Sequence, residues 1–210
     1  MDERQSPFCL DSMVMATVLQ VCVGRARPLR LPGGRTLLSG IGKAPVTGPV
    51  AVSPLGLDGD EQADLSIHGG LAKAVYAYPV EHMAFWREQR RAHGVSLFDE
   101  TLPPGFVGEN LTLAGLLESE VWVGDTLHFD GSDCVLRVTV PREPCGKLAA
   151  VMGYAEAARQ MVREARCGFY LAVEVPGELA AGMALTLLPG QRALSIPDAI
   201  RARWARHRNG

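Results

Sequence analysis

The stretch CVLRVTVPREPCGKLA, Cys134 to Ala149, joins an alternating apolar segment to a segment that contains two prolines and a cysteine. In its first half, apolar side chains recur at every second position, at Cys134, Leu136, Val138 and Val140. A period of two is typical of a β-strand with one buried face. The second half leads from this strand, through two prolines and a cysteine, toward the start of a helix.

Short strand-like segments of the same kind dominate the rest of the chain. Glycine- and proline-containing turn signals separate them, in the sequences LPGG, VTGP, PPG, VPG and LPG. Many short strands with such turns favour a mostly β fold, a closed barrel or a sandwich, over a parallel α/β sheet. The predicted strands, besides Cys134–Val140, are Thr17–Val23, Pro49–Val52, Ala74–Tyr78, Val121–Phe129, Phe169–Val175 and Met183–Leu187.

Three helices are expected to interrupt this pattern. The first is predicted over Pro79–Ala92 and the second over Tyr154–Arg166, which has an apolar face. A short third helix begins at Ser195, in a sequence that resembles a capping box, and continues toward Trp204. The arginines near the end of the chain are expected to form a solvated face of this helix rather than a nucleic-acid-binding arm.

Composition narrows the class of protein. The chain has 210 residues, 47% of them hydrophobic, enough for one buried core. A formal net charge of −2 argues against a main role in nucleic-acid binding. No apolar run approaches the roughly 20 residues that span a bilayer. The acidic, polar start MDERQSPFCLDSMVMA lacks the features of a signal peptide, so a cytoplasmic location is expected.

The predicted organisation is a disordered leader (1–16), a barrel domain (17–190) and a short helical tail (191–210).

The five cysteines do not suggest a disulfide framework, because their number is odd and no CxxC pair occurs. Cys22 and Cys134 lie in alternating apolar segments and are predicted to be core residues. Cys145 differs, because Pro144 restricts the backbone before it and Gly146 frees the backbone after it. Arg142 lies nearby, and positive charge favours a reactive thiolate.

The densest polar segment is LGLDGDEQADLSIHGGLAKAVYAYP, Leu55 to Pro79. A metal site for Mg, Mn or Fe is one hypothesis, built on Asp58, Asp60 and His68. The alternative, favoured here, is a turn-rich loop whose aspartates cap backbone amides. His68 is set apart because two glycines follow it, which would allow a ligand to approach the backbone closely.

Two further segments contain candidate binding residues. SGIGKAP, Ser39 to Pro45, lacks the spacing of a Walker loop, but Lys43 in this loop could pair with an anionic cofactor. Glu109 and Asn110 precede an apolar strand-like run and are expected at the mouth of a strand. A serine hydrolase lacks support because no G-x-S-x-G sequence occurs. Cysteine hydrolysis would require a histidine, His68 or His128, beside Cys145.

Taken together, these segments resemble the MOSC domain family, most closely its free-standing, YiiM-like bacterial branch. The resemblance extends from about Thr17 to Leu188. It implies a mostly β barrel, closed or partly closed, with a few peripheral helices. It also implies a molybdopterin-type cofactor whose molybdenum is bound by the motif cysteine, here Cys145. The motifs are GLDGDEQADLSIHGGLAKAVYAYPVEHMAFW, FVGENLT, VGDTLHF and VPREPCGKL, in the family's order and spacing.

The resemblance extends to other residues of the pocket. Arg142 and Lys147 would favour the Cys145 thiolate and bind the anionic dithiolene and phosphate of the cofactor. A set of further residues matches family motifs that line the pocket, and cofactor contacts are expected of them. These are His68, Asp60, Glu109 and Asn110.

The implied activity is the reduction of N-hydroxylated compounds, such as N-hydroxylaminopurine-type bases or amidoximes, with Cys145 and His68 as catalytic residues. A separate flavin or Fe–S reductase would supply the electrons. Two alternatives are a non-catalytic carrier of the cofactor and the carboxylate-metal enzyme described above. Members of this branch often continue into a three-helix module, whereas one short helix is expected after Pro189. Pyridoxal phosphate, a cofactor of the larger sulfurases, is not expected to bind this chain.

Overall fold

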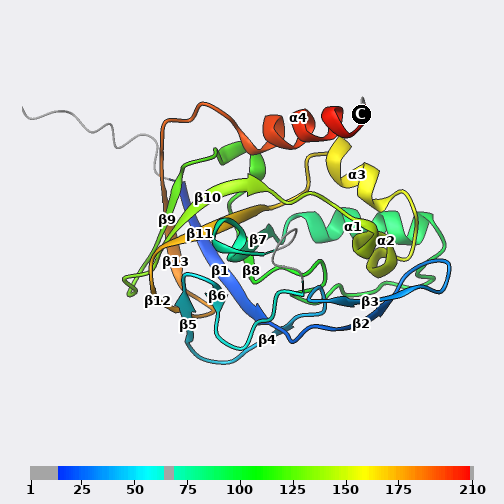
Figure 1. Cartoon of the computed structure of the whole chain (residues 1–210), viewed down its shortest axis with the longest axis horizontal. Helices are drawn as coiled ribbons and strands as arrows, with labels where there is room; N and C mark the ends of the chain where they lie inside the picture. The colour runs from blue at the N-terminus through cyan, green and yellow to red at the C-terminus, as the bar shows by residue number, and fades with distance from the viewer. Residues whose placement is uncertain (1–13, 64–68, 209–210) are drawn as a thin grey trace, which may run out of the picture.

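The barrel closes by hydrogen bonding between its first and last strands, β1 (Val14–Val23) and β13 (Ala184–Leu188). This computed structural model describes residues 14–63 and 69–208. All neighbouring pairs around the barrel are antiparallel except β7 and β8. The predicted mostly β barrel is confirmed, and it is closed (Figure 1). Around the barrel the strands follow the order β13, β9 (Thr126–Phe129), β10 (Val135–Pro141), β11 (Phe169–Val175), β7 (Val75–Pro79), β8 (Leu111–Ala114) and β1.

Smaller sheets flank the barrel. The strands β2 (Arg27–Arg30) and β3 (Thr36–Ser39) form a hairpin. The short strand β4 (Ala44–Pro45) pairs with the end of β1. A three-stranded sheet contains β12 (Gly177–Leu179), β5 (Val50–Ser53) and β6 (Gly56–Leu57).

Helices cover the outside of the barrel. In the described residues these are α1 (His82–Ala92), α2 (Gly146–Met152), α3 (Ala157–Arg163) and α4 (Ile196–Arg208), with 3₁₀ turns at Leu71–Lys73 and Glu118–Glu120. Figure 1 shows α1, α2 and α3 gathered at one end of the barrel and α4 along its upper side. Among the described residues, no helix combines the length and the apolar character required to cross a membrane.

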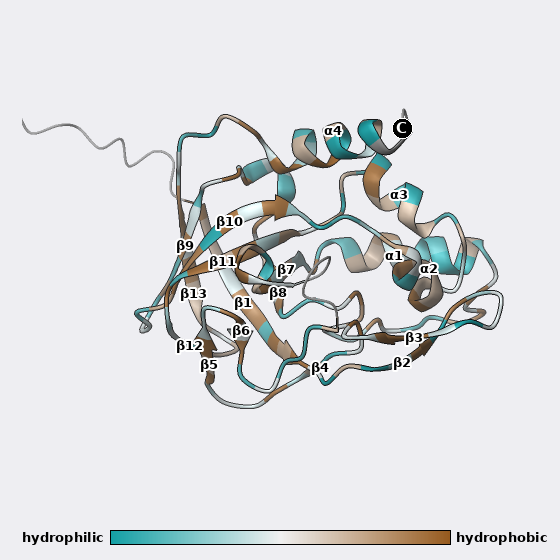
Figure 2. Cartoon of the chain, in the orientation of Figure 1, coloured by the Kyte–Doolittle hydropathy of each residue, from teal (hydrophilic) through white to brown (hydrophobic). Residues whose placement is uncertain are grey.

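The strand β10 follows its predicted alternation as far as Val138. A register shift between Val138 and Val140 then breaks the alternation, so Val140 is only half-buried whereas Thr139 is buried. Leu136 and Val138 are fully buried, and Cys134, just before the strand, is 1% exposed. Fully burying one such aliphatic side chain stabilises the fold by about 1.5–3 kcal/mol. Figure 2 shows hydrophobic colour along β11, whereas α1 and α4 carry both hydrophobic and hydrophilic turns. Cys22 is also fully buried, so the prediction of two core cysteines is confirmed.

Several element boundaries differ from the sequence-based prediction. The helix predicted over 154–166 is α3 alone, and α2 precedes it, because Gly153 ends α2 in the left-handed conformation. Pro79 ends β7, so α1 begins three residues later than expected. The predicted strand 121–129 is a strand only from Thr126, because Asp125 closes a turn by accepting a hydrogen bond from the Trp122 N–H. β1 begins at Val14, ahead of the expected Thr17.

Candidate functional site

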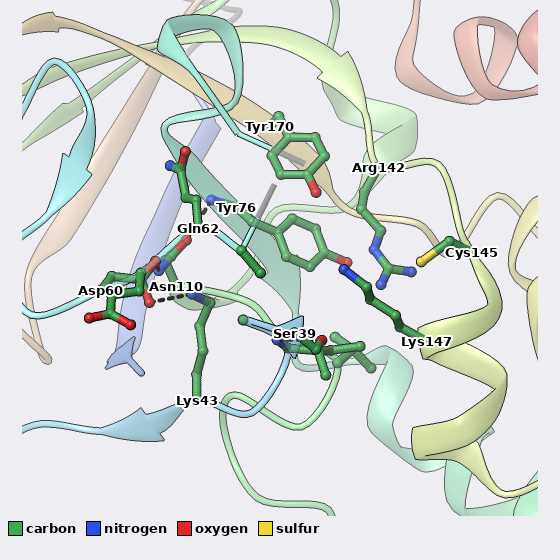
Figure 3. A pocket seen from close by; sticks show the side chains of 16 residues that line it. Ser39, Lys43, Asp60, Gln62, Tyr76, Asn110, Arg142, Cys145, Lys147 and Tyr170 are labelled. Carbon is green, nitrogen blue, oxygen red and sulfur yellow. Dashed lines mark hydrogen bonds and ion pairs between the residues drawn. The ribbon is translucent and has the colours of Figure 1, made fainter. Parts of the chain in front are cut away.

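A pocket with about 560 Å³ of space, partly open to solvent, lies at the end of the barrel where β1 and β10 finish (Figure 3). Its walls come from or beside the barrel strands β7, β8, β10 and β11, from the start of α2 and from the segments 39–43 and 60–63. They are formed by Ser39, Gly40, Ile41, Lys43, Asp60, Glu61, Gln62, Ala63, Tyr76, Val107, Gly108, Asn110, Arg142, Cys145, Lys147 and Tyr170. Of the eight residues that the sequence suggested for the site, six line this pocket.

Cys145 lies at the junction of the segment that follows β10 and the helix α2. Its backbone is extended, and it occupies the N-cap position of α2. Its side chain is half-buried, and it is not in a disulfide. The strand-to-helix junction expected from the sequence therefore places the thiol in the pocket wall (Figure 3).

Arg142 is the most deeply buried cation of the pocket, at 5% exposure. Its guanidinium lies 5.7 Å from the centre of the Tyr76 ring and forms no ion pair among the described residues. Burial acts to lower the pKa of Arg142, but Tyr76 and Tyr170 offset this effect and the net direction is upward. Cys145 acts in the same direction. A buried guanidinium without a carboxylate partner is well suited to binding an anion.

The two lysines of the pocket differ in their surroundings. Lys147 is half-buried in the first turn of α2 and projects into the pocket beside Arg142 (Figure 3). Lys43 is paired with Asp60, and both side chains are almost completely buried. The charge of Lys43 is thus balanced within the protein, whereas Arg142 retains its charge for a bound group.

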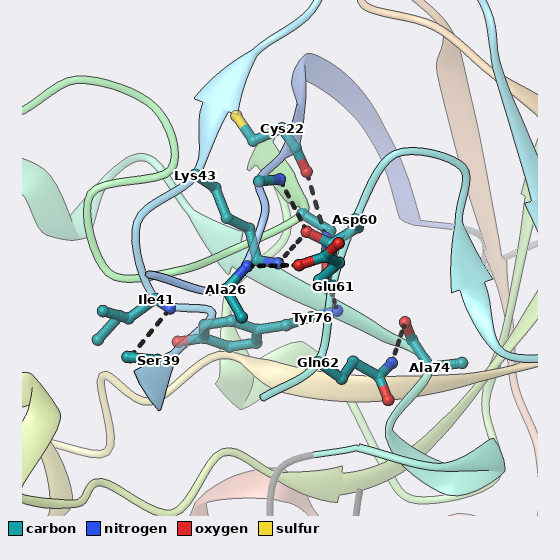
Figure 4. Close-up of polar contacts among 12 residues, drawn as sticks. Cys22, Ala26, Ser39, Ile41, Lys43, Asp60, Glu61, Gln62, Ala74 and Tyr76 are labelled. Atoms are coloured by element: carbon teal, nitrogen blue, oxygen red, sulfur yellow. Dashed lines mark hydrogen bonds and ion pairs between the residues drawn. The ribbon is translucent and has the colours of Figure 1, made fainter. Parts of the chain in front are cut away.

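Asp60 and Asn110 use their polar atoms to hold the pocket wall together. Figure 4 shows Asp60 among its partners near Lys43 and Cys22. Asp60 accepts hydrogen bonds from the Gly24 N–H at 3.0 Å, from Lys43 and from Asn110 Nδ2 at 3.0 Å. Asn110 Nδ2 also donates to the Cys22 carbonyl, and its Oδ1 accepts from the Tyr76 N–H. Both residues line the pocket, but these bonds fix the ends of β1 and β7.

Glu109 is fully buried and does not line the pocket. Its carboxylate accepts hydrogen bonds from the Gly105 N–H at 2.7 Å, the Val107 N–H at 3.2 Å and the Thr112 hydroxyl at 3.0 Å. Burial raises the pKa of Glu109, and these bonds offset part of the increase. Glu109 therefore fixes the turn that places Val107 and Gly108 in the pocket wall. The Glu109 side chain itself does not line the pocket.

His68, the predicted proton donor, lies outside the described residues. The two glycines that follow it are accounted for by the protein's own packing. A Cβ at Gly69 would lie 2.2 Å from Gln62 Oε1, and Gly70 has a φ of +82°. Close ligand approach is therefore not required to explain these glycines.

The alternative chemistries find no support among the described residues. They contain no group of three metal-ligating side chains, Asp58 is exposed and Asp60 is bonded to Lys43. His128, the other histidine considered for cysteine hydrolysis, lies on β9 and contacts Thr126 Oγ1 at 3.1 Å. It is not part of the pocket wall.

The sequence-based prediction missed the two tyrosines of the pocket. Tyr76 on β7 and Tyr170 on β11 are cross-strand partners, and their ring centres are 5.3 Å apart. Both fall within strands that the sequence predicted. The pairing of β7 with β11, which brings them together beside Arg142, has no local sequence signal.

Comparisons with known proteins agree with this geometry. The model of the MOSC domain family matches residues 64–186. Uncharacterized protein YflK of Bacillus subtilis is 35% identical over 90% of this chain and 80% of its own length. Protein YiiM of Escherichia coli is 34% identical over 79% of this chain and 71% of its own length.

Two further similarities concern a longer protein and a solved structure. A Gibberella moniliformis protein named "Reductase" is 34% identical over 89% of this chain, which matches only 32% of that protein. The crystal structure of YiiM from Geobacillus stearothermophilus superposes with a TM-score of 0.68 at 30% identity, over 93% of this chain and 86% of that one.

Proposed function

The chain belongs to the MOSC domain family, and from this premise we propose that it is a molybdenum-cofactor enzyme that reduces N-hydroxylated compounds. The substrates would be N-hydroxylaminopurine-type bases or amidoximes. The main supporting observation is that the Cys145 thiol shares one pocket with Arg142, a buried cation that has no acidic partner among the described residues.

The pocket residues fit a molybdopterin-type cofactor. A thiolate is a soft ligand, suited to a heavy metal with sulfur ligands, whereas the carboxylate of Asp60 in the pocket wall is already bonded. The guanidinium of Arg142 and the ammonium of Lys147 suit the anionic groups of such a cofactor.

In this proposal Cys145 holds the metal, and Arg142 and Lys147 bind the anionic parts of the cofactor. When bound, the molybdenum group supplies the two electrons that, with two protons, convert an N–OH compound to the amine and water. Tyr76 and Tyr170 exclude water from one wall, and His68 delivers a proton. A histidine is suited to this transfer because its pKa lies near neutrality.

The electrons would come from a separate flavin or Fe–S reductase. The sequence has no CxxC pair, and three of the four cysteines in the described residues are buried in the core. The name of the Gibberella relative supports reductive chemistry, and two thirds of that protein has no counterpart in this chain.

The test is expression in a cofactor-competent host supplied with molybdate, followed by molybdenum and pterin analysis. Turnover is then measured with N-hydroxylaminopurine and benzamidoxime, using reduced methyl viologen as the donor. We expect the purified protein to retain both components and to form the amines. Absence of molybdenum would contradict the proposal. Retention without turnover of either compound would instead support a non-catalytic carrier.

A further inference from the structure

Basic residues are concentrated in one part of the chain. No acidic residue lies between Ser12 and Leu57, although the whole chain has a formal net charge of −2. The same span contains five basic residues, which are Arg25, Arg27, Arg30, Arg35 and Lys43. Lys43 is paired with Asp60, whereas the four arginines lie on and beside the β2–β3 hairpin. The acidic side chain nearest to them in the hydrogen-bond network is Glu61, which accepts from the Ala26 N–H.

These four arginines are all exposed, and none forms an ion pair or side-chain hydrogen bond in the described part of the chain. Like charges placed close together repel one another, and these arginines form no ion pair in the described residues that would offset the repulsion. A group of exposed basic side chains without acidic partners produces a positive potential that attracts an anionic partner.

The register of the hairpin gives it two different faces. Pro28 is opposite Leu38, and Arg30 is opposite Thr36, so these four side chains share one face, and all of them are exposed. On the other face, Ser39 is buried against the body of the protein. The outward face therefore presents Leu38, 55% exposed, beside Arg30. Arg27, which is opposite Ser39, lies on the other face but is also exposed.

This outward face adjoins the pocket. Leu38 and Leu55 line an open hollow whose other wall is the segment 60–63, and the same segment forms part of the pocket wall. The chain also continues from β3 through Ser39 directly into the pocket lining. A partner on the hairpin would thus be close to the pocket that contains Cys145.

We propose that this hairpin patch, formed by Arg25, Arg27, Arg30, Arg35 and Leu38, is the docking surface for an acidic electron-donor protein that carries a flavin or an iron–sulfur group. The inference rests on the proposed function, since a reductase without its own donor group requires such a partner. Electron transfer needs the donor group close to the acceptor, and the position of the patch beside the pocket meets that condition.

The composition of the patch fits a protein better than a nucleic acid. No aromatic residue occurs between Thr17 and Leu57, whereas single-stranded nucleic acids are held largely by stacking on aromatic side chains. Arginine is enriched at protein interfaces, and an exposed leucine supplies an apolar contact there. Transient redox complexes have small interfaces, and complementary charge accelerates their formation.

The test uses two acidic probes, a two-iron ferredoxin and a flavodoxin, with the holoenzyme. The variant Arg27→Glu/Arg30→Glu reverses charge on the patch. The matched control, Arg201→Glu/Arg206→Glu, makes the same change on exposed positions of α4, which lies across the molecule from the hairpin (Figure 1). Binding of the oxidised probes is titrated at low and high salt, and turnover is measured with the reduced probes and with reduced methyl viologen.

We expect salt-sensitive binding of at least one probe to the wild type. The hairpin variant should lose about tenfold or more in the second-order rate with that probe at low salt. The α4 control should change by less than about twofold, because its charges lie away from the docked partner. The viologen rate should be the same in all three proteins.

Failure of both probes to bind, or equal losses in the two variants, would overturn the docking surface. Tight binding of an oligonucleotide that the hairpin variant loses would assign the patch to nucleic acid instead. If the hairpin variant has a lower methyl viologen rate than the wild type only with phosphorylated substrates, the patch captures substrate rather than a donor protein. Probe binding that depends on the patch, without viologen turnover of any N-hydroxy compound, would contradict the proposed reductase function while leaving the docking surface in place.

Discussion

The Nε2 atom of His82 lies 2.7 Å from Oε2 of Glu118, and both side chains are buried. On the other side of the ring, Arg166 Nη1 lies 2.9 Å from His82 Nδ1. Because a guanidinium can only donate, Nδ1 accepts from Arg166, and Nε2 then donates to Glu118. His82 therefore links Arg166 to Glu118. The other oxygen of Glu118 accepts from the Gly168 N–H at 2.6 Å, just before β11.

Glu118→Gln should lower the free energy of unfolding by about 3 kcal/mol, because the amide has one acceptor oxygen where the carboxylate accepts two bonds. A buried donor, the His82 or the Gly168 N–H, would then lack a partner. The measurement is urea denaturation. In the control, Glu164→Gln removes a solvent-exposed partner of Arg163 and should change stability by less than about 0.5 kcal/mol. Equal effects of the two substitutions would refute the role of the network.

Glu109 should make stability depend on pH in the direction opposite to most carboxylates. Burial raises its pKa, so the folded state binds this proton more tightly than the unfolded state does. As pH rises from the ordinary glutamate pKa through the raised value, the unfolded chain ionises first and stability falls. Relative to Glu109→Gln, the wild type should therefore lose stability across this window and remain level above it.

A second carboxylate provides the control for this pH dependence. Arg90 lowers the pKa of Glu100 through a side-chain hydrogen bond, so the sign reverses. The contribution of Glu100 should be present at neutral pH and lost on acidification through its lowered pKa. Denaturation of the wild type, Glu109→Gln and Glu100→Gln between about pH 3 and pH 8 gives both slopes. Parallel curves for the two variants would show that the assignment for Glu109 is wrong.

A strand was predictable where its own sequence places apolar residues at alternate positions, as the first part of β10 does. The hairpin β2–β3 was not predicted, because arginines interrupt its apolar positions and only the LPGG turn was recognised. A closed or partly closed barrel was expected from the family resemblance. The closure itself, with Val14 in register with Leu187, depends on pairing between distant strands, which no local window contains. The break between α2 and α3 depends on the left-handed conformation of Gly153.

In the candidate site, too, the residues of one local motif were predictable, whereas roles that depend on neighbouring strands were not. Cys145 and Arg142 share one short motif, and the structure places both in the pocket wall. Asn110 was expected near a cofactor, but its side chain bridges β1, β7 and the Asp60 loop, a role that depends on strand neighbours. Glu109, next to it in sequence, is directed away from the pocket.

Cys145→Ser should abolish molybdenum retention and N-hydroxy reduction while leaving the fold almost intact. Serine is a favoured N-cap residue, so the start of α2 tolerates it, but its hydroxyl is a poor substitute for a soft thiolate. The control is Cys134→Ser, which places a hydroxyl at a site that is 1% exposed and should cost about 1–3 kcal/mol of stability. Full molybdenum content and turnover in Cys145→Ser would exclude the assigned role.

His68→Gln should lower the rate of N-hydroxy reduction by about 10²-fold or more without lowering molybdenum content. Glutamine keeps hydrogen-bonding capacity but cannot transfer a proton near neutral pH. The matched control is Asp58→Asn in the same acidic segment, because Asp58 is exposed and does not line the pocket. If His68→Gln equals the wild type in both metal content and rate, proton delivery belongs to another group.

Arg142→Ala should reduce cofactor retention far more than Arg201→Ala does. The Arg142 guanidinium is buried, lacks a carboxylate partner among the described residues and lies in the same pocket as Cys145. Arg201 is a suitable control, because it contacts Asp198 at the surface, where both side chains are more than half exposed. Arg203 is not an equivalent control, since it pairs with Glu143, the residue next to Arg142.

The measurement is molybdenum and pterin per folded chain after gel filtration, so that any loss of stability is separated from loss of binding. Arg142→Lys adds a finer comparison, because it keeps the charge but lacks the planar fork that binds phosphate through two hydrogen bonds. We expect retention to decrease in the order wild type and Arg201→Ala, then Arg142→Lys, then Arg142→Ala. If Arg142→Ala retains as much cofactor as Arg201→Ala, the anionic groups of the cofactor are bound elsewhere.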